Sequence, residues 1–308
     1  MIEAHLSLLL VVIPLLAAPV TAILPNGRLP WLLTLLVSWL CFAIAIWQFV
    51  LVMDGNVISY ELGGWAPPWG IEYRIDIVNA FVALIVAGMA AITLPYAMLS
   101  VEQEIPKDKL SLFYATFLLC MDGLLGITLT GDIFNLFVFL EISSLSTYAL
   151  ISMGRQRRAL TAAYQYLIMG TIGATFLLIG IGLIYAETGT LNMTDLSARL
   201  PAVFEHRTVH TAFAFIVVGV GLKLAMFPLH LWLPNAYTYS PSAVTVFLAA
   251  TATKVAVYVM LRLVFTVFSI GFAYVTPTDD MFMLVGALGV IVASIYAIYQ
   301  QDAKRLLA

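Results

Sequence analysis

The sequence has 308 residues, of which 62% are hydrophobic and only 10% are charged. A soluble domain carries roughly 25% charged residues to keep its surface wet, so this composition excludes a water-soluble globular protein and indicates lipid as the solvent. The net charge is -3 and no basic stripe runs along the chain, which argues against a nucleic-acid partner. Cys41 and Cys120 lie in apolar runs, where small buried hydrophobes are expected and neither a disulfide nor a metal site is indicated.

Nine apolar segments, in chain order, are long enough to cross a bilayer, which takes about 20 residues of helix. Backbone groups in lipid must be satisfied within each segment, so helices are expected. The first run is read as a retained span, because a signal peptide would carry a basic leader. The sequence thus predicts an all-α, polytopic transmembrane bundle with spans at about 6–24, 31–53, 75–99, 110–130, 132–152, 162–186, 209–229, 243–268 and 281–300.

The placement of lysine and arginine predicts the orientation, because cytoplasmic loops carry the excess of positive charge. With the N-terminus outside, four basic residues fall on outside ends: Arg74, Arg199, Arg207 and Arg262. Eight fall on inside loops: Arg28, Lys107, Lys109, Arg155, Arg157, Arg158, Lys304 and Arg305. We therefore expect a multi-pass protein of the cell inner (plasma) membrane with its N-terminus outside.

Three charged residues fall near the middle of the membrane, each on a different predicted span: Glu141, Lys223 and Lys254. A lysine at a helix centre costs about 2.5–3.5 kcal/mol on insertion scales, and neither lysine is close enough to an interface for snorkelling to be the favoured explanation. Glu141 should face the bundle interior and a cation, with a purely structural ion pair as the alternative. Burial and pairing shift proton affinity in opposite directions, so the three groups predict a relay for protons or cations.

Two aspartates are treated separately. Asp122 lies within the fourth span, where a place on the ion path and a local hydrogen-bonded role are both open. Asp132 follows the short link between two spans and is predicted to be the N-cap of the next helix.

The segment from 210 to 239 is too interrupted for one continuous helix. Four helix-disturbing residues surround Lys223: Gly219, Gly221, Pro228 and Pro234. Proline removes a helical hydrogen bond, and broken membrane helices are tolerated where they line a cavity. We expect a broken helix near 222–234 beside a hydrated cavity, with a kinked continuous helix as the alternative.

Histidine titrates near neutral pH, so His230 in this break suits a proton relay, although an interfacial histidine without a role is the alternative. The predicted cavity joins Lys223 to Lys254, and the Thr251 and Thr253 hydroxyls are expected to help hold its waters.

Four stretches resemble one family, the antiporter-like membrane subunits. Residues 227–236, FPLHLWLPNA, resemble its P-x-H-x-W-L-P-x-A motif, and residues 130–143, TGDIFNLFVFLEIS, resemble its glutamate helix. The SPSA and TKVAVY stretches between 240 and 258 resemble its lysine helix, and residues 301–308 resemble the loop that opens its next helix. The family joins the proton-pumping subunits of respiratory complex I with the large subunits of Mrp-type cation/proton antiporters. Within the family, the sequences of the glutamate and lysine helices are most similar to the Mrp antiporter D subunit.

The resemblance implies that Glu141 and Lys223 form the coupled pair, that Lys254 is the inner relay and that His230 links the path to one membrane face. The family has about fourteen helices with two inverted five-helix repeats. The resemblance therefore implies one transmembrane domain, 1–308. It would comprise three N-terminal helices (1–109), the first repeat (110–268) and the truncated start of a second (269–308), so we expect a piece of a longer protein.

The leading functional hypothesis is a secondary transporter subunit that exchanges protons for sodium or another monovalent cation, together with other membrane subunits. The alternative is a proton-pumping membrane subunit of a redox-driven complex, such as an NADH:quinone oxidoreductase or a membrane-bound hydrogenase. The sequence has no cysteine cluster for an iron–sulfur centre, no haem-attachment motif and no nucleotide loop. We expect no cofactor in this chain, so any redox chemistry belongs to partner subunits. A scaffold without an ion path fits poorly with three charges in the membrane.

Overall fold

The computed structural model describes residues 5–273 and 275–307, so Ala308 lies outside it. Nine helices in these residues are long and apolar enough to cross a membrane, which confirms the predicted polytopic all-α bundle. They are α1 Leu6–Ile23, α2 Arg28–Val52, α3 Ile77–Glu104, α4 Leu110–Leu129, α5 Ile133–Ser152, α6 Arg157–Thr188, α8 Arg207–Leu224, α10 Ser242–Leu261 and α12 Thr278–Ile298. Three short helices lie between them, α7 Met193–Arg199, α9 Leu233–Tyr239 and α11 Ser269–Ala273, and a fourth, α13 Ala303–Leu307, follows α12.

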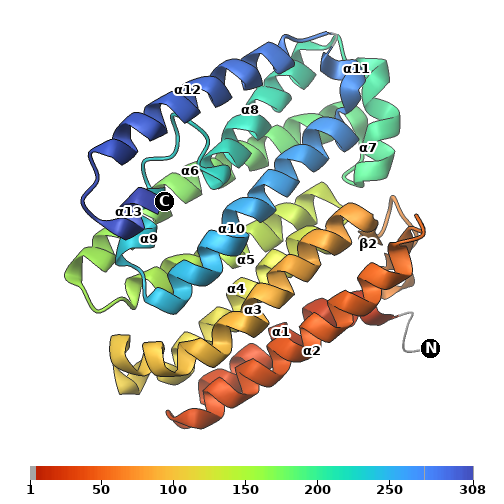
Figure 1. Ribbon diagram of the computed structural model, residues 1–308. Helices are drawn as coiled ribbons and strands as arrows, with labels where there is room; N and C mark the ends of the chain where they lie inside the picture. Colours follow the sequence, from red (N-terminus) through yellow and green to blue (C-terminus); the bar gives the residue numbers. More distant parts are fainter. Residues whose placement is uncertain (1–4, 274, 308) are drawn as a thin grey trace.

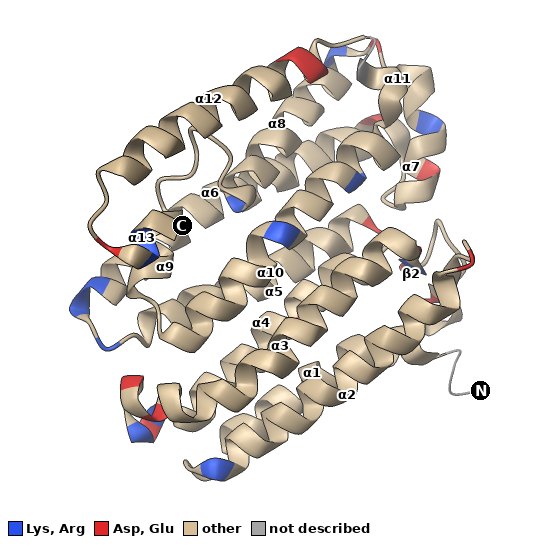
Figure 2. Cartoon of the chain, viewed as in Figure 1, with Lys and Arg blue, Asp and Glu red and all other residues tan. Residues whose placement is uncertain are grey.

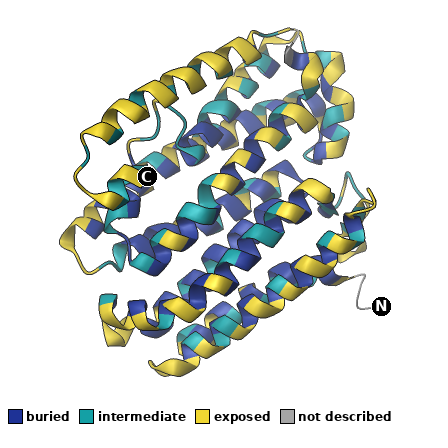
Figure 3. Ribbon diagram, viewed as in Figure 1, coloured by how far each residue is buried: buried dark blue, intermediate teal, exposed yellow. Residues whose placement is uncertain are grey.

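The long helices are arranged so that α1 and α2 lie along one edge and α12 along the opposite edge (Figure 1). Between these edges α4 packs against α5 and α1, and α6 packs against α8. In the most apolar stretch of α4, 83% of the residues are buried, whereas in α12 none are. The exposed residues along α12 are plain in Figure 3. The core of the described residues therefore centres on α4, and α12 lies at its margin.

Charged residues gather at the helix ends, with few in between (Figure 2). Lysines and arginines are concentrated at the end of the bundle that holds α13 and the start of α2, whereas β2 and α11 lie at the other end. This separation agrees with the charge asymmetry from which the orientation was predicted. The orientation itself stays a prediction.

A small β-hairpin, which the sequence analysis did not predict, closes the end of the bundle opposite α13. Strand β1, Ile58–Glu61, pairs antiparallel with β2, Glu72–Ile75. The Gly131 N–H donates to the Glu72 carbonyl at 2.9 Å, and the Asn192 amide donates to the buried Glu72 carboxylate at 2.7 Å. The hairpin therefore ties the α4–α5 link to the α6–α7 link.

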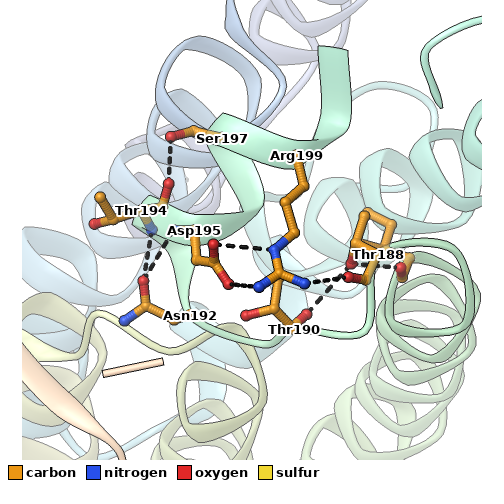
Figure 4. Close-up of polar contacts among 8 residues, drawn as sticks. Thr188, Thr190, Asn192, Thr194, Asp195, Ser197 and Arg199 are labelled. Carbon is orange, nitrogen blue, oxygen red and sulfur yellow. Dashed lines mark hydrogen bonds and ion pairs between the residues drawn. The ribbon is translucent and has the colours of Figure 1, made fainter. Parts of the chain in front are cut away.

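The α6–α7 connection is held by polar contacts of its own (Figure 4). The Asn192 side chain accepts from the Thr194 and Asp195 backbone N–H groups, both at 3.0 Å, and so caps α7. Arg199, one helical turn after Asp195, donates to that carboxylate and to the Thr188 carbonyl, each at 3.0 Å. These bonds fix the loop whose Leu191 carbonyl accepts from the Ile133 N–H at the start of α5.

Candidate functional site

The helix that carries Lys223 is broken directly after it. Helix α8 ends at Leu224, Ala225 adopts a left-handed conformation with φ +59°, and turns follow until α9 begins. The Met226 N–H closes the helix end by donating to the Gly221 carbonyl at 2.9 Å, a left-handed termination that usually carries glycine. The predicted break is confirmed, and the alternative of a continuous kinked helix is wrong.

The four helix-disturbing residues play different parts. Pro228 lies in the turns and Pro234 in the first turn of α9, a position proline tolerates because its missing N–H has no partner there. Gly219 lies a turn before the break, where a Cβ would come within 2.7 Å of the Gly173 carbonyl on α6. Gly219 therefore serves the close contact of α6 with α8, and the break itself begins after Lys223.

The Lys223 ammonium lies against one face of α5. Its Nζ is 3.2 Å from the Glu141 Oε1, 2.6 Å from the Ser144 Oγ and 3.5 Å from the Tyr148 hydroxyl. The lysine side chain is 5% exposed and the glutamate side chain 26% exposed. Residues three and seven positions apart share a helix face, so α5 presents all three oxygens to the ammonium. The predicted proximity of Glu141 and Lys223 is confirmed.

An aromatic stack connects this ion pair with the broken helix. The Tyr148 ring meets the Tyr166 ring edge-on at 4.7 Å, and Tyr166 lies parallel to Trp232 at 3.8 Å. The Trp232 indole N–H then donates to the Leu222 carbonyl at 2.9 Å. Sequence reasoning did not identify Ser144, Tyr148 or Tyr166, although the spacing of Glu141, Ser144 and Tyr148 on α5 carried a signal for the first two.

A cavity of about 20 Å³ adjoins Lys223, between α4, α5 and α10. Its polar lining includes Ser143, Ser144 and Thr147. A cavity of this size that is lined partly by hydroxyl groups is large enough for one water molecule. The site therefore combines an ammonium, a carboxylate, hydroxyls and room for a water, which are the parts that a proton transfer requires.

Lys254 does not join this group. Its side chain is exposed, and its Nζ donates to the Ala249 carbonyl at 2.6 Å and to the Thr253 hydroxyl at 3.3 Å. The cavity beside Lys223 is lined by α10 residues that flank Lys254, but not by Lys254 itself. The Thr251 hydroxyl donates to the Phe247 carbonyl of its own helix. The observed cavity beside Lys223 therefore does not include Lys254, contrary to the prediction of one cavity that joins the two lysines.

His230 lies in a separate and larger cavity of about 420 Å³ between the broken helix and α12. The cavity is mostly apolar, and its lining also includes Arg305. The His230 Nδ1 is buried and has no hydrogen-bond partner among the described residues. The structure thus brings Glu141 and Lys223 together, whereas His230 lines a separate cavity and Lys254 is exposed.

The two aspartates also differ. The Asp132 carboxylate accepts from the Asn135 N–H at 2.7 Å, so its prediction as the N-cap of α5 is confirmed. Asp122 is completely buried on α4, and neither carboxyl oxygen has a hydrogen-bond partner in the part of the chain that the structure describes. Of the two roles left open for Asp122, local hydrogen bonding is not observed.

Together, the helices and the ion pair define a polytopic membrane protein with a buried lysine–glutamate pair at a broken helix. Residues 130–308 match the family model described as NADH:quinone oxidoreductase/Mrp antiporter, transmembrane. The chain belongs to this family, and the predicted resemblance is confirmed.

Its relatives include subunits of NADH-quinone oxidoreductases and subunits of Na(+)/H(+) antiporters. The chain is 42% identical over 308 residues to the N subunit of the NADH-quinone oxidoreductase of Desulforudis audaxviator, covering 99% of this chain and 61% of that protein. It is 30% identical over 256 residues to the D subunit of the Na(+)/H(+) antiporter of Bacillus subtilis, covering 83% and 50%. The chain therefore spans only about half to three fifths of the length of these curated relatives.

Solved structures with the same fold come from a respiratory membrane complex and from an Mrp complex. A chain of the archaeal membrane-bound sulfane sulfur reductase superposes with a TM-score of 0.90 and 32% identity, covering 98% of this chain and 61% of that one. A chain of the Mrp complex from Dietzia sp. superposes with a TM-score of 0.86 and 27% identity, covering 100% and 56%. The chain thus shares its fold with a chain of an Mrp complex and with a chain of a respiratory membrane complex.

Proposed function

We propose that this chain belongs to a proton-translocating membrane subunit in which the Glu141–Lys223 pair takes up and releases the proton. The observation that carries the proposal is the 3.2 Å contact between these side chains directly before the helix break. The Lys223 ammonium and its partner oxygens form a group whose proton can pass to the single water that the adjoining cavity accommodates. A break at this point lets the chain around Lys223 move without unwinding all of α8.

In this proposal, Lys254 and His230 extend the path in opposite directions. Lys254 would receive the proton from Lys223, and His230 would connect the pair to one membrane face. Both steps require a rearrangement or further water, since neither residue contacts Lys223. The broken helix is the element best placed to undergo this rearrangement, because transporters commonly place ion sites at such breaks.

We propose Na⁺/H⁺ exchange as the reaction in which the protons move, in a plasma-membrane complex with other membrane subunits. The likeness of the glutamate helix to the Mrp antiporter D subunit and the antiporter relatives support this proposal. The second candidate is a redox-driven proton pump, which the 42% identity to an NADH-quinone oxidoreductase subunit favours. Glu141 and Lys223 would serve both functions, so the two differ in the driving reaction that partner subunits supply.

The experiment uses the full-length subunit within its own complex, in inverted membrane vesicles with a fluorescent pH indicator. For an antiporter, adding Na⁺ to energised vesicles should move protons outward from the lumen. For a redox pump, proton movement should follow the electron donor and ignore Na⁺. Glu141→Gln should abolish either activity at unchanged protein abundance. Full activity of this variant would refute the proposed role of the pair.

A further inference from the structure

A second ionisable group lies in the bundle at about the depth of the ion pair. Asp122 is on α4, the most enclosed of the described spans, and has no exposed surface. A Cβ on its neighbour Gly123 would lie 2.6 Å from the Ser143 backbone nitrogen. Because Ser143 is only two residues from Glu141, the two carboxyl groups belong to one layer of the membrane.

The surroundings of Asp122 on its other side come from the N-terminal helices. The Ser38 hydroxyl of α2 contacts the Met121 sulfur at 3.6 Å, directly before Asp122. Cys41 on α2 and Tyr73 on β2 are ionisable groups near enough to feel a charge on Asp122. Neither is a cation. None of the ion pairs in residues 5–273 and 275–307 includes Asp122.

An ionised carboxylate in such a place would have neither a counter-ion nor a hydrogen-bond donor. Burying an unpaired charge costs so much that the group changes its protonation state instead. A carboxylic acid that carries its proton is uncharged and fits the apolar packing of α4. We propose that Asp122 is a second proton-binding site, distinct from the Glu141–Lys223 pair, and that it holds a proton in the conformation described here.

The proposal assigns Asp122 a coupling role, and this role rests on the proposed function. When the Asp122 proton leaves, a negative charge appears in the same layer as Glu141 and Lys223. That charge favours the ammonium form of Lys223 and disfavours the carboxylate form of Glu141. Loss of a proton from Asp122 would therefore draw a proton onto the pair, and its return would help the pair release one.

Infrared spectroscopy of the full-length subunit in its complex tests the site without measuring transport. The readout is the C=O stretching band of a protonated carboxylic acid at neutral pH, in unmodified protein and in Asp122→Asn. The asparagine variant keeps the size of the side chain but cannot bind the proton, so a band should disappear. The same band should persist in Glu141→Gln. An unchanged band in Asp122→Asn would overturn the proposal.

The coupling role is tested by transferring the complex into heavy water. The Asp122 band should shift to its deuterated position faster during proton translocation than in a resting sample. If the shift is equally slow in both samples, the proton is trapped and the coupling role is refuted. Normal transport by Glu141→Gln would instead refute the proposed function, while leaving the carboxylic acid band at Asp122 in place.

Discussion

The indole N–H of Trp232 donates to the carbonyl of Leu222 at 2.9 Å, and Leu222 is the residue directly before Lys223. The ring that makes this bond also stacks on Tyr166. One side chain thus holds a carbonyl at the broken end of α8 and packs on the aromatic side chains beside the ion pair. This arrangement links the conformation of the break to the position of the ammonium.

Trp232→Phe should therefore lower proton translocation several-fold while the protein still folds. Phenylalanine can keep the stacking, but the Leu222 carbonyl loses one of its two donors and keeps only the Ala225 N–H at 3.3 Å. Loss of such a hydrogen bond costs about 0.5–1.5 kcal/mol. Translocation in vesicles, normalised to protein abundance, measures the effect. Trp31→Phe is the matched control, because Trp31 donates to the Leu94 carbonyl at 2.9 Å, far from the ion pair in sequence. Equal losses in both variants would show that only general stability is affected.

Ser144→Ala should impair translocation more than Ser146→Ala. The Ser144 hydroxyl is 2.6 Å from the Lys223 Nζ, whereas the Ser146 hydroxyl donates to the Ile142 carbonyl of its own helix. Losing a hydrogen bond to a charged group costs about 1.5–3 kcal/mol, so the pH dependence of translocation should shift in Ser144→Ala alone. Matching pH profiles in the two variants would contradict the assigned contact.

Gly170→Ala tests whether the position of the Tyr148 hydroxyl matters, because Gly170 on α6 lies directly against that hydroxyl. A Cβ at Gly170 would overlap that hydroxyl, whereas a Cβ at Gly182, on the same helix, would meet nothing within 4 Å. Gly170→Ala should displace Tyr148 from Lys223 and reduce translocation. Gly182→Ala should leave it unchanged, and both should tolerate alanine as a helix former. Full activity in Gly170→Ala would show that the tyrosine position is unimportant.

Gly219→Ala should destabilise the packing of α6 on α8, because a Cβ there would come within 2.7 Å of backbone atoms of Gly173 and Leu177. Backbone atoms cannot turn aside as a flexible side chain can, so we expect a cost of about 1–3 kcal/mol. Thermal unfolding of the purified complex measures it. An unchanged unfolding temperature would mean that the two helices separate at little cost.

The spans, the break and the ion pair were predictable because each has a strong local cause. Twenty apolar residues cross a bilayer, proline interrupts a helix, and Glu141 and Lys223 each need a partner in lipid. Which way a side chain points is harder to predict. The large apolar residues of α10 are not confined to one face, so their pattern does not show which face is buried. For this reason the exposed position of Lys254 was not foreseen.

The β-hairpin and the oxygens around Lys223 were missed for other reasons. Strands of four residues between two spans give no hydrophobic alternation long enough to recognise. Ser144 and Tyr148 lie in an apolar span where hydroxyls are unremarkable, and their importance follows only once Lys223 is known to face α5. Asp122 was noticed, but its lack of partners depends on the packing of α2, α4 and α5.

The central claim, that the Glu141–Lys223 pair carries the proton, is tested most directly by comparing three variants in the full-length complex: Glu141→Gln, Lys223→Met and the double substitution. The measurement is the initial rate of proton translocation in inverted vesicles, normalised to protein abundance. Because groups that transfer a proton contribute about 10²–10⁴-fold to rates, each single variant should lose about a hundredfold or more. Since both belong to one unit, the double variant should be no slower than the worse single variant. A double variant that translocates protons at the unmodified rate would contradict the account.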